Sequence, residues 1–179
     1  MHEAQGVVRE FADVARRYVA AIDAANDLSP EEFLLAIHPI LCELVYRASL
    51  LPDVDYEGDF PADDMTLTQW SGIFEFLGSM LGEYDNYWEV FDPARVDDED
   101  PITSGLSDDL ADIYRDVAVG LEPEDRFDHH IPEAAIAAWR FTFRSHWGLH
   151  AMTALRVIQA RIAYHGLGDD LLDGDASGA

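Results

Sequence analysis

Apolar side chains recur every three or four residues along most of this chain, a spacing that places them on one face of a helix. The first stretch has Val7, Phe11, Val14, Tyr18 and Ile22 on a common face. The same spacing predicts helices at about residues 3–25, 30–51, 66–81, 107–121 and 132–165. Because no convincing alternating strand pattern accompanies them, we expect an all-α fold, a single-domain bundle of about five helices with a long C-terminal helix.

Two of the expected helices begin with a capping box, in which side chains and backbone amides of the first turn satisfy each other. Ser29 is followed three residues later by Glu32, and Thr66 is followed by Gln69. Pro39 lies inside the second expected helix, where its ring removes a hydrogen-bond donor and clashes with the preceding turn. We therefore expect the second helix to be kinked.

Between the expected helices the periodic pattern gives way to turn-forming and acidic residues. Residues 52–65 read as an acidic loop, residues 84–91 as a short helix or an extended segment, and residues 92–105 as a polar connection. The last residues are rich in Gly and Asp, which is typical of a flexible terminus. The pattern thus predicts a helical domain at residues 1–166 and an acidic, flexible tail at residues 167–179.

The charge of the chain is strongly negative. It carries 36 acidic residues against 11 basic ones, all of them Arg, for a formal net charge of −25. Such a charge repels nucleic-acid phosphates and anionic membranes, so we expect neither as a partner. The acids are spread through the loops and most helix faces, which favours a solvated surface over rows of charge that would mimic a nucleic acid.

The cysteine content and the chain termini bear on the cellular compartment. Cys42 is the only cysteine, which excludes a disulfide within the chain and a cysteine-based metal cluster. The N-terminal residues lack the basic start and apolar stretch of an export signal. The longest apolar run, residues 33–45, is interrupted by polar residues and Pro and is not expected to span a bilayer. We therefore expect a cytoplasmic location.

Histidines occupy the inward face of the last expected helix. Trp139, Phe143, His146, His150 and Ala154 share one face at helical spacing, so the two histidines continue an apolar stripe. Two hypotheses remain open for them. They are core histidines that bond to carboxylates or backbone, or they are a pair of divalent-metal ligands, because imidazoles four residues apart on one helix converge on one ion.

Acidic residues lie at the edge of the preceding helix, for which Ser107 is the expected cap. Asp109, Asp112 and Asp116 flank its apolar stripe. If the two helices pack together, these carboxylates face the histidines of the last helix. Arg140 or Arg144, which flank the histidine face, would then meet an Asp in a partly buried ion pair.

In the metal hypothesis, oxygen ligands come from this same edge. Asp109 and Asp112 would complete the donor set that His146 and His150 begin. The two-histidine spacing alone is a weak signal, since it lacks the intervening Glu of a metalloprotease.

A second candidate metal site lies in the acidic loop after the second expected helix. Its spacing of acids resembles the start of a calcium-binding EF-hand loop, with candidate ligands Asp53, Asp55, Glu57, Asp59 and Asp64. Pro61 falls at the ninth position, and the last ligand is Asp rather than the longer, bidentate Glu. A solvated acidic loop is the competing interpretation.

Two longer strings resemble the signature stretches of a known family. LSDDLADIYRD (106–116) and FRSHWGLHAMTALRVI (143–158), with LPDVD (51–55) and YWEVFDP (87–93), are similar to the uncharacterised bacterial family catalogued as domain of unknown function 5063. The resemblance implies a small helical protein and supplies no activity. Its patterned positions match Ser107, Asp109, Asp112, Tyr114, His146, Trp147 and Gly148. We group the acids, the two arginines, the two histidines, Tyr114 and Trp147 as a predicted polar seam.

These observations predict a non-enzymatic acidic helical protein that binds a protein partner or forms a homo-oligomer, with no cofactor. The alternative is a divalent-metal-binding enzyme or sensor that uses His146 and His150 with Asp109 and Asp112. A mimic of nucleic acid is a third hypothesis.

Overall fold

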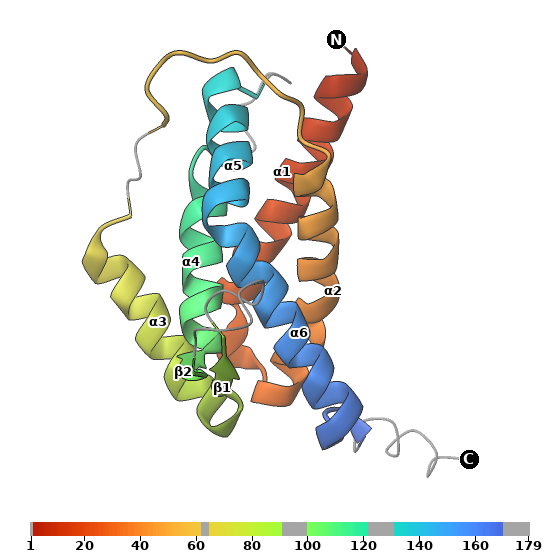
Figure 1. The fold of residues 1–179 in the computed structure, drawn as a ribbon, viewed down its shortest axis with the longest axis vertical. Helices are drawn as coiled ribbons and strands as arrows, with labels where there is room; N and C mark the ends of the chain where they lie inside the picture. Colours follow the sequence, from red (N-terminus) through yellow and green to blue (C-terminus); the bar gives the residue numbers. More distant parts are fainter. Residues whose placement is uncertain (1, 62–64, 91–99, 122–130, 170–179) are drawn as a thin grey trace.

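A helical bundle, in which the consecutive helices α5 (Glu133–Ser145) and α6 (Trp147–His165) together take the place of a fourth helix, forms the body of the protein. The computed structural model describes residues 2–61, 65–90, 100–121 and 131–169. Helices α1 (His2–Asp23), α2 (Pro30–Ser49) and α4 (Leu106–Ala118) pack side by side with α5 and α6 (Figure 1). Helix α3 (Leu67–Leu81) lies outside this bundle against α4. The expected all-α class is confirmed.

Both predicted capping boxes are present. The Ser29 hydroxyl accepts the Glu32 N–H at 3.3 Å, while the Glu32 carboxylate accepts the Ser29 N–H at 2.9 Å. Thr66 and Gln69 form the same reciprocal pair at the start of α3. Pro39, for which we predicted a kink, lies inside α2, and the helix continues beyond it to Ser49.

A small sheet interrupts the helical pattern. Strands β1 (Asn86–Glu89) and β2 (Ile102–Gly105) pair antiparallel, with Tyr87 opposite Ser104. Two short 3₁₀ turns accompany the helices, η1 (Ala25–Asp27) and η2 (Gly82–Tyr84), and the second leads into β1. The aromatic segment, for which the sequence allowed a short helix or an extended segment, begins at the end of a 3₁₀ turn and continues as a strand. The expected polar connection ends in the second strand, β2. The hairpin lies at the end of the bundle where α4 begins (Figure 1).

The prediction of one continuous helix over residues 132–165 is wrong, because the helix is broken at His146. This residue has φ −147° and ψ −88°, outside the helical region, and separates α5 from α6. The chain turns so sharply here that a Cβ at Gly148 would overlap the Phe143 carbonyl oxygen. The break changes the direction of the chain between the two helices (Figure 1).

The predicted apolar face of the first helix is buried. Phe11 is fully buried and lies between Trp139 and Trp147, with ring centroids 5.0 and 6.3 Å away. Tyr18 is also buried, and its hydroxyl donates to the Leu110 carbonyl at 2.8 Å. Helix α1 thereby supports both the broken C-terminal pair and α4.

The helical body ends a little beyond residue 166. Leu167 is buried in the core, and its N–H bonds to the Arg161 carbonyl. Most of the predicted tail, residues 170–179, lies outside the described residues. Across the described parts of the chain, no helix is long and apolar enough to cross a membrane.

Candidate metal centre

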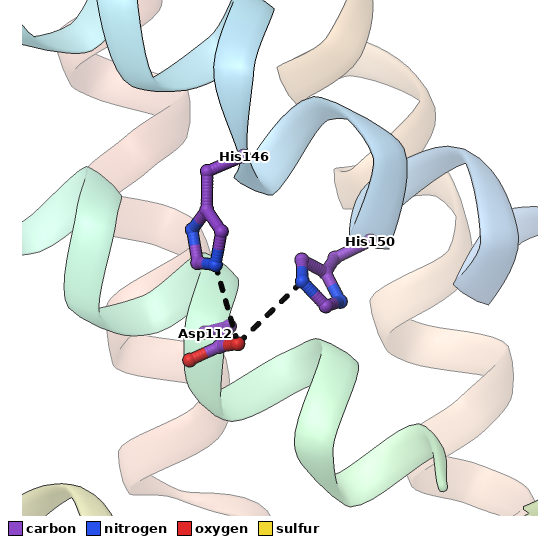
Figure 2. Close-up of side chains that lie close together, drawn as sticks. All are labelled: Asp112, His146 and His150. Carbon is purple, nitrogen blue, oxygen red and sulfur yellow. Dashed lines mark ion pairs between the residues drawn. The ribbon is translucent and has the colours of Figure 1, made fainter. Parts of the chain in front are cut away.

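Two histidines and three aspartates face each other between α6 and α4. Helix α4 carries Asp109, Asp112 and Asp116 on successive turns. His146 lies at the break between α5 and α6, and His150 lies one turn further along α6. We call these five residues the His–Asp cluster. The three of them drawn in Figure 2 point toward one another from the two helices.

Asp85 fixes the start of α4 and, with it, the position of the three aspartates. Its carboxylate accepts hydrogen bonds from the Ser107 N–H and hydroxyl, at 2.8 and 3.1 Å. The expectation that Ser107 caps this helix is wrong, because α4 begins at Leu106 and its N-cap residue is Gly105. The capping carboxylate comes instead from the segment before β1.

Both ring nitrogens of His146 face carboxylates. Its Nδ1 lies 2.7 Å from Asp116 Oδ2, a hydrogen-bond distance. Its Nε2 lies 3.5 Å from Asp112 Oδ2, which is longer than an ordinary N–H···O hydrogen bond. Asp116 thus holds the ring by one nitrogen and turns the other toward Asp112.

His150 has the same arrangement with a different holding group. Its Nδ1 lies 2.8 Å from Asp109 Oδ1, and its Nε2 lies 3.5 Å from Asp112 Oδ2. The two imidazole rings meet edge to face, with centroids 4.9 Å apart. Figure 2 shows both rings directed at the same Asp112 oxygen.

The remaining carboxylate oxygens have their own donors. Asp112 Oδ1 accepts from Trp70 Nε1 at 3.0 Å and lies 3.2 Å from an Arg115 guanidinium nitrogen. Asp109 Oδ2 accepts the Tyr87 hydroxyl at 2.8 Å. Asp112 Oδ2 is therefore the oxygen left facing the two Nε2 atoms.

Sequence reasoning did not place Trp70, Tyr87 or Arg115 in the site. One signal existed for the two aromatic residues, because a buried indole N–H or phenol O–H needs an acceptor and the seam is rich in carboxylates. For Arg115, the signal was its position three residues after Asp112 on the same helix.

Burial and hydrogen bonding shift the pKa values within the cluster. Burial raises the pKa of Asp109, although its bonds from His150 and Tyr87 act in the opposite direction. The hydrogen bond with Asp109 raises the pKa of His150, helped by the nearby charges of Asp112 and Asp108. Burial, and then the charge of Asp112, raises the pKa of Asp108. Burial thus disfavours the charged form of these carboxylates, whereas their proximity favours a positive charge on His150.

The expected ion pair between the last helix and the Asp edge is corrected by the structure. Arg140 donates to the Leu51 carbonyl at 2.7 Å and pairs with Asp53, away from α4. Arg144 forms no ion pair or hydrogen bond within the described residues. The guanidinium that meets the aspartates belongs to Arg115, because this side chain already lies on α4.

Two further members of the predicted seam also lie elsewhere. The Tyr114 hydroxyl donates to Asp23 of α1 at 3.1 Å, so this side chain joins α4 to α1. Trp147 is fully buried in the core against Phe11 and Phe143.

The described acids of the candidate calcium loop do not converge on one point. Asp53 pairs with Arg140, and its side chain is 87% exposed. The Tyr56 hydroxyl donates to the Asp59 carbonyl, which tightens the turn around Glu57. Asp64 lies outside the described residues. Within those residues the loop contributes no group of three converging ligands, so calcium binding there stays a prediction.

Asp112, His146 and His150 have the spacing of metal ligands. One ligand atom from each lies within 4.8 Å of the other two, the one such group within the described residues. Ligand atoms held about 2.1 Å from a tetrahedral ion lie about 3.4 Å apart, close to the two 3.5 Å separations. The side chains of His146, His150 and Asp112 are 36%, 26% and 13% exposed, which leaves access from solvent.

Comparison with known proteins identifies the family. The family described as Domain of unknown function (DUF5063) matches residues 2–165. The chain belongs to the DUF5063 family. A crystal structure of protein BF1032 from Bacteroides fragilis is similar to the DUF5063 chain, with 25% identity and a TM-score of 0.71 over 86% of this chain and 90% of that one. No curated protein matches the chain.

Positions that the resemblance to DUF5063 singled out now fall into two groups. Asp109, Asp112 and His146 belong to the His–Asp cluster, while Ser107 holds the start of α4 through Asp85. Tyr114, Trp147 and Gly148 serve the packing and the helix break. Neither the DUF5063 family nor the BF1032 structure assigns an activity to these positions.

Proposed function

We propose that this DUF5063 protein binds a divalent transition metal through His146 Nε2, His150 Nε2 and Asp112 Oδ2. The observation that carries the proposal is that both Nε2 atoms face the same Asp112 oxygen at 3.5 Å. Two imidazoles and one carboxylate suit zinc, iron, manganese or cobalt better than calcium or magnesium, which prefer oxygen ligands.

The hydrogen bonds around the cluster support this proposal. When Nδ1 of each ring donates to Asp116 or Asp109, the neutral ring carries its lone pair on Nε2. Two such lone pairs then face the anionic oxygen of Asp112. The arrangement needs a positive charge between these atoms, supplied by a metal ion or by protons on the rings. Carboxylates that hold metal-ligating histidines by the second nitrogen are a common feature of metal sites.

The three-ligand set favours a reactive centre. Structural zinc sites are closed by four protein ligands, whereas catalytic sites keep a position for water or substrate. Here the described residues offer three ligands, and the two histidines are partly exposed. We therefore favour a metal-dependent enzyme over a metal sensor, working in the cytoplasm as the sequence predicts.

Metal analysis and calorimetry test the proposal. We expect the purified protein to hold close to one equivalent of metal. After metal is removed with a chelator, the protein should bind zinc, manganese or, under anaerobic conditions, iron(II) with the same stoichiometry. His146→Gln and His150→Gln should abolish tight binding. The matched control His165→Gln changes an exposed histidine at the end of the same helix and should bind as the wild type does. Equal binding by all four proteins, or none by the wild type, refutes the proposal.

Self-association is a second candidate function with its own observation. Leu149 and Met152 lie three residues apart on α6 and are 72% and 56% exposed. Large apolar side chains exposed on one helix face favour contact with a protein, and we propose a second copy of this chain as that partner. Light scattering across a concentration series should then show a dimer that Leu149→Asp dissociates. A monomer at all concentrations contradicts this candidate.

A further inference from the structure

A cleft beside α5 is lined by residues other than those of the His–Asp cluster. It has a volume of ≈ 390 Å³ and runs between α5 and the segment after α2. Its walls include Arg140, Phe141 and Arg144 from α5, with Tyr56 and Phe60 from the facing segment. Its volume lies within the range of small-molecule sites, about 300–1,000 Å³.

Arg144 brings to this cleft a positive charge that has no partner among the described residues. It forms no ion pair or hydrogen bond within the described residues, although the chain has 36 acidic residues. Elsewhere, Arg16, Arg17, Arg47 and Arg115 all pair with carboxylates. A guanidinium that no described carboxylate pairs with, in so acidic a protein, is available to bind an anion.

Arg140 holds a second guanidinium one turn away. Its position is set by a hydrogen bond to the Leu51 carbonyl at 2.7 Å. Its contact with Asp53 is longer, 3.4 Å, and the Asp53 side chain is 87% exposed, so this surface pair is weak. Like charges four residues apart on a helix repel each other. An anion between Arg140 and Arg144 removes that repulsion.

Aromatic side chains from both walls line the cleft beside the two arginines. The rings of Phe60 and Phe141 pack with centroids 5.5 Å apart, and both side chains are partly exposed. Tyr56 lies beside them, with its hydroxyl bonded to the Asp59 carbonyl. A cationic corner beside exposed aromatic rings complements a molecule with an anionic group and a flat apolar body.

We propose that this cleft binds a small organic anion, a ring-bearing phosphate monoester or carboxylate. Its anionic group binds between Arg144 and Arg140, and its ring packs on Phe141 and Phe60. The inference rests on different residues from the metal proposal and goes beyond it.

Titration with small probes, followed by the backbone amide NMR signals, tests the cleft. We expect phenyl phosphate to cause saturating shifts confined to residues 53–60 and 137–145. Benzoate carries a carboxylate in place of the phosphate. If it shifts the same signals, the cleft accepts carboxylates as well as phosphate monoesters. Inorganic phosphate and benzyl alcohol each lack half of the recognised chemistry and should bind more weakly.

Variants separate the cleft from general charge effects. Arg144→Ala removes an exposed side chain and should weaken phenyl phosphate binding about 10- to 100-fold, since a hydrogen bond to a charged group contributes roughly 1.5–3 kcal/mol. Phe141→Ala should weaken phenyl phosphate but leave inorganic phosphate unchanged. Arg17→Ala, which removes a surface arginine on α1, is the matched control and should bind as the wild type does.

Three results overturn the inference: no saturable binding of phenyl phosphate, equal binding by wild type and Arg144→Ala, or shifts that centre on residues 146–150. The last result would place the anion at the proposed metal instead. His150→Gln should bind phenyl phosphate normally, so a failed metal proposal leaves this test intact.

Discussion

Asp112 is the residue on which the proposed site depends, because its two oxygens have different tasks. Oδ1 accepts from Trp70 and lies beside Arg115, which fixes the orientation of the carboxylate. Oδ2 faces the two histidine Nε2 atoms. An Asn at this position keeps an oxygen for Trp70 and places an amide N–H₂ where Oδ2 was.

Asp112→Asn therefore distinguishes a metal site from a purely structural ion pair between Asp112 and the two histidines, which we call the clasp. Where the imidazoles are neutral, we expect the metal-free variant to be at least as stable as the wild type, because the amide donates to an imidazole lone pair. Metal affinity should fall by about 100-fold or more, since a second-sphere change alone costs 10–100-fold. Thermal melts of chelated protein and calorimetry measure the two effects. A large loss of metal-free stability with unchanged metal affinity would favour the clasp.

Asp116→Asn tests the group that holds His146. The amide disturbs the hydrogen bond at Nδ1 without touching a proposed ligand atom. We expect metal affinity to fall about 10- to 100-fold with an intact fold. Asp13→Asn is the control, because Asp13 is an exposed acid paired with Arg16 on α1. Equal affinities for the two variants would remove Asp116 from the account.

The raised pKa of His150 predicts two opposite dependences on pH. A histidine whose folded pKa exceeds its unfolded value, about 6.5, stabilises the protein below that value. This contribution is lost as pH rises through the folded pKa. The melting temperature of the metal-free protein should therefore decrease, as far as His150 determines it, over that pH interval. Metal binds the neutral ring, so the stabilisation by metal should increase over the same interval.

Comparison with His150→Gln isolates this effect from other histidines. Burial lowers the pKa of His38, which gives stability the opposite pH dependence. The difference between wild type and His150→Gln removes that common contribution. A difference that does not change with pH contradicts the account.

Among the elements, the break between α5 and α6 determines where the histidines lie. In one continuous helix, His146 and His150 would lie one turn apart on a straight face. The break at His146 turns α6 so that both rings reach the aspartates of α4. Gly148 permits this break, because a side chain there would meet the Phe143 carbonyl.

Gly148→Ala should therefore destabilise the protein, by about 1–3 kcal/mol as expected for overpacking against a fixed group. Gly72→Ala provides a matched control inside α3, where a Cβ meets nothing within 4 Å. It should stabilise the protein by roughly 0.5–1 kcal/mol through helix propensity. Denaturant unfolding measures both, and equal effects of the two substitutions would show that the break does not require glycine.

The periodic pattern predicted the helices well but not their partners. Stripes such as Phe11 with Tyr18 predicted burial, and the capping boxes at Ser29 and Thr66 predicted where two helices begin. Periodicity reports which face is buried and not what it meets. The break at His146 and the pairing of β1 with β2 depend on contacts between distant segments, which a local pattern does not encode.

The candidate site shows the same limit. Residue types and helical spacing predicted that His146, His150 and Asp112 lie close together, as they do. The same reasoning placed Arg140 beside the aspartates, whereas it bonds to the Leu51 carbonyl. Tyr87 reached the site through a strand that the sequence left ambiguous.

At the scale of the whole molecule, negative charge is the dominant surface property. A net charge of −25 on a chain of 179 residues makes the compact state repel itself. Salt screens such repulsion over a distance of about 10 Å at 0.1 M ionic strength. We expect the melting temperature to rise with added sodium chloride, measured on chelated protein so that metal does not contribute. A melting temperature that falls with salt would show that attractive ion pairs outweigh the repulsion.

The proposed metal centre draws its residues from several parts of the fold. Its ligands come from α4 and the start of α6, and the groups around them come from α3 and β1. A metal bound there would join these elements, so that binding adds directly to the stability of the folded bundle.

Anomalous diffraction from crystals of the protein loaded with zinc or cobalt tests this central claim most directly. We expect a peak bound by His146 Nε2, His150 Nε2 and Asp112 Oδ2 at about 2.0–2.2 Å. Loaded crystals with no peak at these three residues, and with both histidines bonded only to their aspartates, would contradict it.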